Sequence, residues 1–126
     1  MGGWGTRALV IDPEGYVLPC HAARGLPLEH DRTPARPLAD IWREGAAFSA
    51  FRGEGWMEEP CKSCSERGRD FGGCRCQALA LAGRATAADP ACDRSPFHGR
   101  LVALTRPPAG VELPSVRYRL RQYAGS

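Results

Sequence analysis

The sequence has no long apolar run and almost no lysine. A membrane-spanning helix needs about 20 consecutive apolar residues, and no segment approaches that length, so we expect no membrane association. Of the 17 cationic side chains only Lys62 is a lysine, and the formal net charge is +3. Outside residues 117–121 no basic run is interleaved with aromatic residues, so we expect no nucleic acid as a partner.

A secretory signal pattern is also missing, because residues 1–5 have neither a basic start nor an apolar run. We therefore expect a cytoplasmic location, in which six cysteines do not form a disulfide framework. Closely spaced cysteines are also poor disulfide partners, because their short loops close with strain. The chain is rich in Gly (15) and Pro (11), which indicates long irregular stretches. A loop-rich chain of this size needs additional cross-links, and bound metal can supply them.

Four of the six cysteines lie within residues 61–76, as a C-x2-C pair followed by a C-x-C pair. C-x2-C places two thiolates in one tight turn, where both can bind one metal centre. The two sulfurs of C-x-C diverge on an extended backbone, which suits a polynuclear cluster or two separate sites. Gly72 and Gly73 permit the positive φ values of a chain that wraps around an inorganic core. Cys20 and Cys92 are then candidates for closing ligands.

The spacing leaves two kinds of metal open. A single zinc site would use four thiolates and leave Cys20 over. Its candidate ligands are Cys61, Cys64, Cys92 and either Cys74 or Cys76, with His21 or His98 as further donors. Iron–sulfur chemistry would use all six cysteines and a carboxylate in two centres. The alternative to a redox function is therefore a zinc-stabilised interaction module.

The chain predicts short elements around these motifs. Residues 8–18 predict a β-hairpin with a D-P-E-G turn, and residues 23–36 predict a loop. A helix is expected from Leu38, behind Pro37, to Gly45, and a second short helical segment over residues 46–51. Another helix is predicted over 76–82, with Gly83 as its stop. Four aromatic residues are expected in the core: Trp42, Phe48, Phe51 and Trp56.

Several motifs occur in a characteristic order. They are G-W-G at 3–5, L-P-C-H-A-A at 18–23, A-F-x-x-F-R-G at 47–53, E-P-C-K-S-C at 59–64 and D-F-G-G-C-R-C-Q at 70–77. On these motifs the chain closely resembles the C-terminal SPASM domain of the radical-SAM PqqA peptide cyclases of pyrroloquinoline quinone biosynthesis. The resemblance implies a small, loop-rich, metal-stabilised α+β domain over residues 1–98. Residues 99–126 are expected to form an extended or partly disordered tail.

The resemblance implies two auxiliary iron–sulfur clusters. A [4Fe–4S] cluster would be held by Cys61, Cys64, Asp70 and Cys92. A [2Fe–2S] cluster would be held by Cys20, Cys74 and Cys76, with a fourth cysteine expected just ahead of Met1. Arg75 is a candidate for tuning cluster charge, and the alternative is a solvated surface arginine. For Asp70 the alternative is a surface carboxylate paired with Arg67, Arg69 or Arg75.

The resemblance also implies a function for the whole enzyme. Such enzymes join Glu and Tyr side chains of the precursor peptide PqqA through a carbon–carbon bond, and the chaperone PqqD presents the peptide. The auxiliary domain would serve electron transfer and peptide positioning beside a catalytic radical-SAM domain. The C-x3-C-x2-C motif that binds the catalytic cluster and S-adenosylmethionine does not occur in this sequence. By itself the chain should therefore be an inactive part of an oxidoreductase.

Overall fold

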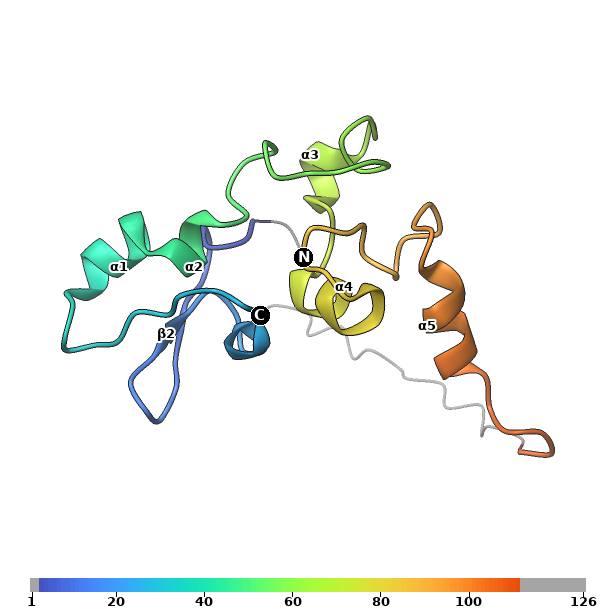
Figure 1. The fold of residues 1–126 in the computed structure, drawn as a ribbon, viewed down its shortest axis with the longest axis horizontal. Helices are drawn as coiled ribbons and strands as arrows, with labels where there is room; N and C mark the ends of the chain where they lie inside the picture. The colour runs from blue at the N-terminus through green and yellow to red at the C-terminus, as the bar shows by residue number, and fades with distance from the viewer. Residues whose placement is uncertain (1–2, 112–126) are drawn as a thin grey trace, which may run out of the picture.

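The structure is a computed structural model that describes residues 3–111, and it shows a small α+β domain (Figure 1). Strand β1 (Val10–Ile11) pairs antiparallel with β2 (Val17–Leu18). The turn between them is fastened by Asp12, whose carbonyl accepts a hydrogen bond from the Gly15 N–H at 2.9 Å. The Asp12 carboxylate also accepts from the Tyr16 N–H at 2.9 Å. These contacts confirm the predicted hairpin.

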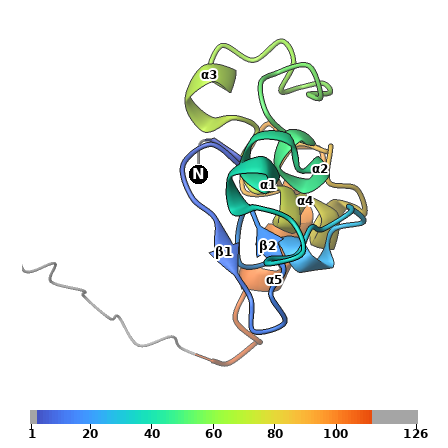
Figure 2. The same ribbon diagram turned by 90° about the vertical axis from the view of Figure 1, so that its left-hand side faces the viewer.

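Short helices make up the rest of the described chain. They are the 3₁₀ turn η1 (Ala23–Gly25), α1 (Leu38–Glu44), α2 (Ala46–Ser49), α3 (Arg67–Asp70), α4 (Arg75–Ala82) and α5 (His98–Thr105). The predictions that became α1, α2 and α4 are confirmed, and Gly83 ends α4 with φ of 82°. In both views α3 lies above α4, away from the hairpin (Figure 2). Among the helices of residues 3–111, none is long and apolar enough to cross a membrane.

Three of these elements depart from the predictions. The turn η1 falls in a segment predicted as loop, and α3 is a single turn inside the cysteine-rich segment. The predicted tail is wrong at its start, because α5 is helical where extended chain was expected. Two hydrogen bonds to earlier segments hold α5. The His98 ring bonds the Pro90 carbonyl at 2.9 Å, and Arg100 donates to the Leu81 carbonyl at 2.6 Å. Residues 112–126 of the predicted tail lie outside the described residues.

The hydrophobic core has two parts, one on each side of strand β2. Neighbouring side chains on a strand point to opposite faces, so the buried pair Val17 and Leu18 serves two clusters. Val17 packs with Ile41 of α1 and Phe48 of α2. The cluster around Leu18 contains Ala23, Leu26 and Phe51. Cys20 and Cys76 pack against this second cluster, so the core directly supports two of the predicted ligands.

The bulky aromatic residues link the core to the cysteine-rich segment. Phe51 lies edge-on to Trp4 at 5.3 Å and to Trp56 at 5.1 Å between ring centroids. Trp42 lies against Phe48 at 5.6 Å. The predicted core role of all four aromatic residues is therefore confirmed, although the two tryptophans are only partly buried.

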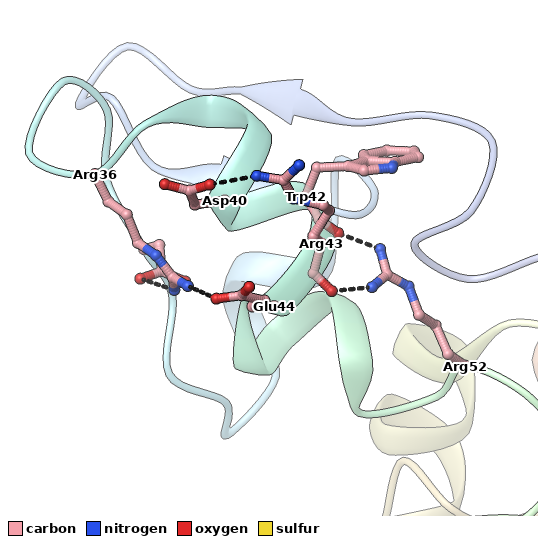
Figure 3. A network of polar contacts seen from close by, with 7 residues as sticks. Arg36, Asp40, Trp42, Arg43, Glu44 and Arg52 are labelled. Carbon is pink, nitrogen blue, oxygen red and sulfur yellow. Dashed lines mark hydrogen bonds and ion pairs between the residues drawn. The ribbon is translucent and has the colours of Figure 1, made fainter.

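Arg52 joins the N-terminal loop to the end of α1, and its loss should destabilise the fold. Its guanidinium donates to the carbonyls of Arg43 (2.8 Å) and Trp42 (Figure 3). It also donates to the carbonyl of Gly5 at 2.6 Å. Hydrogen bonds from a charged donor contribute about 1.5–3 kcal/mol each, less where they are exposed. We expect Arg52→Ala to lower the free energy of unfolding by about 2 kcal/mol, measured by urea denaturation.

Arg43 provides the matched control for this prediction. Its side chain makes one exposed ion pair with Asp40, at 2.7 Å (Figure 3). Exposed pairs contribute at most about 1 kcal/mol, so Arg43→Ala should have little effect. Equal losses of stability in the two variants would show that the Arg52 contacts to backbone carbonyls are unimportant.

Candidate metal centre

The first candidate site is a pocket of about 270 Å³. Its walls include the four residues predicted to hold one cluster: Cys61, Cys64, Asp70 and Cys92. Three separate segments contribute them: the C-x2-C turn, the end of α3 and the loop before α5. Asp89 and Arg94 also line the pocket. The fold therefore brings together donors that are spread over residues 61–92 of the sequence.

Local backbone geometry aims these donors at the pocket. The Cys64 N–H donates to the Cys61 carbonyl at 3.1 Å, which closes the tight turn that C-x2-C predicts. After Asp70 the chain reverses through three consecutive positive φ values, 52° at Phe71, 73° at Gly72 and 78° at Gly73. Such values favour glycine, so the positive φ values predicted for the Gly-Gly pair are confirmed. The reversal lets the wall of the pocket follow directly after its carboxylate.

Asp70 makes none of the ion pairs that the surface alternative requires. Among residues 3–111, Arg67 pairs with Glu54 at 2.7 Å and Arg69 with Glu66 at 2.9 Å. The Asp70 carboxylate accepts one hydrogen bond, from the Gly72 N–H at 2.9 Å. Most of its lone pairs are therefore available to a metal in the pocket.

The second candidate site is a neighbouring pocket of about 260 Å³. Cys20 and Cys74 line it, together with the aromatic rings of Trp4 and Trp56. The sulfur of Cys76 lies 3.5 Å from the sulfur of Cys20. Burial, with help from the neighbouring thiols, raises the pKa of Cys76 to about 12. Thiols crowded in this way are readily deprotonated only when they bind a metal, because the metal ion offsets the mutual repulsion of the thiolates.

The two pockets share one wall. Gly73 lines both of them, Gly72 lines the first, and Cys74 and Arg75 line the second. The side chain of Asp89 fastens this wall: its carboxylate accepts from the Cys74 N–H at 2.6 Å and from the Ala91 N–H at 3.0 Å. One buried carboxylate thus ties a ligand of the second site to the loop that carries Cys92.

Sequence reasoning named Cys92 as a candidate ligand but did not predict the role of Asp89. The local signal was present, since an Asp often accepts a hydrogen bond from the N–H two residues ahead. Its bond to Cys74 spans 15 residues of sequence and required the structure. Because Asp89 already accepts two backbone hydrogen bonds, it is less free than Asp70 to bind a metal.

Arg75 is buried, contrary to the alternative of a solvated surface arginine. Its side chain is 1 % exposed, and within the described part of the chain its Nε has no hydrogen-bond partner. Nη1 donates to the carbonyls of Ala85 (2.8 Å) and Ala87 (2.9 Å), and Nη2 donates to that of Gly72. The guanidinium also lies over the Trp56 ring, 4.4 Å from its centroid. A buried cation of this kind fits an anionic group in the adjacent pockets.

The donor set of the first pocket bears on the choice between zinc and an iron–sulfur cluster. Among residues 3–111, no three Cys, His, Asp or Glu side chains converge closely enough to hold a single metal ion. The six cysteines are all free thiols, and three of them surround the first pocket together with Asp70. Of the histidines weighed for zinc, His98 bonds a carbonyl and His21 lines neither pocket. Thiolate-rich walls around a pocket suit a polynuclear iron–sulfur cluster.

Known proteins match nearly the whole chain. The SPASM family, described as an iron-sulfur cluster-binding domain, matches residues 3–65. The PqqA peptide cyclase of Methylobacterium nodulans is 52% identical over 120 residues, covering 94% of this chain and 32% of that protein. That of Ruegeria pomeroyi is 57% identical over 105 residues, covering 82% and 28%. The chain spans about a third of the length of the curated relatives it matches.

These matches confirm the resemblance drawn from the motifs. The family match ends at residue 65, inside the cysteine-rich segment. The relatives align over 94% of the chain, so their similarity extends past that segment. The two pockets and their thiols therefore lie within a region shared with these relatives. The chain belongs to the SPASM family of iron–sulfur cluster-binding domains.

Proposed function

We propose that the chain is the auxiliary iron–sulfur domain of a radical-SAM PqqA peptide cyclase. The observation that carries the proposal is the first pocket, whose walls bring together Cys61, Cys64, Asp70 and Cys92. These residues would hold a [4Fe–4S] cluster with one oxygen ligand. Cys20, Cys74 and Cys76 would hold a [2Fe–2S] cluster, for which they supply three of the four ligands.

The chemistry of a bound cluster is one-electron transfer. The chain's own residues would set how easily that electron is accepted. A carboxylate is a harder donor than a thiolate and more easily displaced, so Asp70 would change the potential of the first cluster and leave an exchangeable position. Arg94 donates to the Cys64 sulfur at 3.1 Å, a contact that stabilises negative charge on that ligand.

The activity of the whole enzyme belongs to the same proposal. Its relatives are named PqqA peptide cyclases, and the PqqA peptide is therefore the proposed substrate. The reaction would join a Glu and a Tyr side chain of that peptide, which PqqD presents, in a catalytic radical-SAM domain. The auxiliary domain formed by this chain would transfer electrons and help to position the peptide. Without the catalytic domain it should not cleave S-adenosylmethionine.

Metal analysis of the 126-residue chain tests the proposal. After anaerobic reconstitution with iron and sulfide, we expect a brown protein with about four irons per chain if only the first site fills. About six irons would mean that both sites fill. The measurement is iron and zinc per chain together with the visible spectrum. Bound zinc without colour would instead leave a structural interaction module, because zinc has no charge-transfer absorption in this range.

A further inference from the structure

Arg75 is a buried cation that forms no ion pair with another side chain of residues 3–111. It stands in the first turn of α4, where the helix dipole disfavours a positive charge. None of the ion pairs among residues 3–111 includes it. Its contacts are three backbone carbonyls and the face of Trp56. Buried charges are normally paired at close range, so a fold that buries this one without an ion pair needs a physical reason.

The position of the guanidinium supplies that reason. It bonds the carbonyl of Gly72, which lines the first pocket, and it lines the second pocket itself. A Cβ placed on Gly72 would lie 3.3 Å from Arg75 Nη2, so the guanidinium packs closely against a residue that lines the first pocket. The charge thus lies beside the walls of both pockets.

We propose that Arg75 is a counter-charge shared by the two sites, and that its positive charge makes the cluster at the first site easier to reduce. The proposal rests on the proposed function. Thiolate-ligated clusters are anionic, and each added electron increases the negative charge. A fixed cation behind the wall stabilises the reduced form more than the oxidised form, because electrostatic energy grows with the charge of the partner. Burial in a region of low dielectric strengthens this effect.

A redox titration of the reconstituted 126-residue chain tests this role. Arg75→Gln removes the charge, and we expect at least a tenfold fall in the equilibrium constant for reduction. For one electron this is a shift of about 59 mV to more negative potential. Arg75→Lys keeps the charge, and its potential should stay much nearer to that of the unmodified chain. Visible absorption and electron paramagnetic resonance report the fraction of reduced cluster.

Arg69 offers a control with the same change of charge. It is next to Asp70, but its side chain is 84% exposed and paired with Glu66. Water screens such a charge, so Arg69→Gln should hardly change the potential. Equal potentials in Arg75→Gln and the unmodified chain, or equal shifts in Arg75→Gln and Arg69→Gln, would overturn the proposal.

The lysine variant decides the case in which Arg75→Gln does not load iron. A loaded Arg75→Lys protein with a potential near the original would support the role of the charge. If neither variant loads iron, the guanidinium contacts rather than the charge are what the site requires, and the proposal is overturned. Failure of the proposed function is a distinct result, because the unmodified chain would then show no iron chromophore.

Discussion

Replacing Cys92 by alanine is expected to abolish the [4Fe–4S] absorption of the reconstituted chain. Cys92 comes from the loop before α5 and is the most distant donor in sequence on the wall of the first pocket. Its loss leaves two thiolates and one carboxylate, a set that cannot complete the four positions of the cluster. We expect the iron content to fall by about four per chain. Iron analysis and the visible spectrum measure the loss.

Cys20→Ala is the matched control for this experiment. Cys20 lines the second pocket and packs against the core around Leu18, so the substitution removes a thiol of similar burial from the other site. The absorption of the first site should persist in that variant. Asp70→Ala should behave like Cys92→Ala if the carboxylate is a ligand. A brown Cys92→Ala protein with unchanged iron would remove Cys92 from the ligand set.

Much of the local structure could be predicted because it depends on short-range signals. The hairpin follows from the D-P-E-G turn at Asp12, and α4 ends where Gly83 can adopt a positive φ. The helix α5 could not be predicted in this way. Its anchors are the carbonyls of Pro90 and Leu81, contacts that no local pattern encodes. A sequence pattern gives the propensity of such a segment, whereas tertiary contacts determine whether it forms.

The same distinction applies to the metal site. The donor residues could be named from their motifs and from the family resemblance, and the structure gathers them around two pockets. The burial and contacts of the groups behind the donors could not be predicted. Sequence reasoning alone left open whether Arg75 is buried or solvated. Its 1 % exposure results from packing against Trp56 and the carbonyls of Ala85 and Ala87. Asp89 likewise acts through a distant backbone N–H.

Gly73→Ala is expected to disrupt the wall between the two sites. A Cβ at position 73 would lie 2.5 Å from Asp89 Cβ and 2.8 Å from its Cγ, closer than real Cβ contacts allow. The Asp89 carboxylate would have to move, and the N–H groups of Cys74 and Ala91 would lose their acceptor. Each of these hydrogen bonds contributes about 0.5–1.5 kcal/mol. We therefore expect lower iron content and a lower urea midpoint for the loaded chain.

Gly83→Ala is the control that distinguishes the effect of this clash from the effect of backbone strain. It has φ of 82°, close to the 78° of Gly73, but nothing lies within 4 Å of a Cβ built on it. Gly83→Ala therefore carries only the cost of a positive φ, about 1–2 kcal/mol, and should load iron normally. If both alanine variants lose the same stability and the same iron, strain alone explains the result. A larger loss of stability and iron in Gly73→Ala would mean that the close packing of Asp89 on Gly73 stabilises the wall between the two sites.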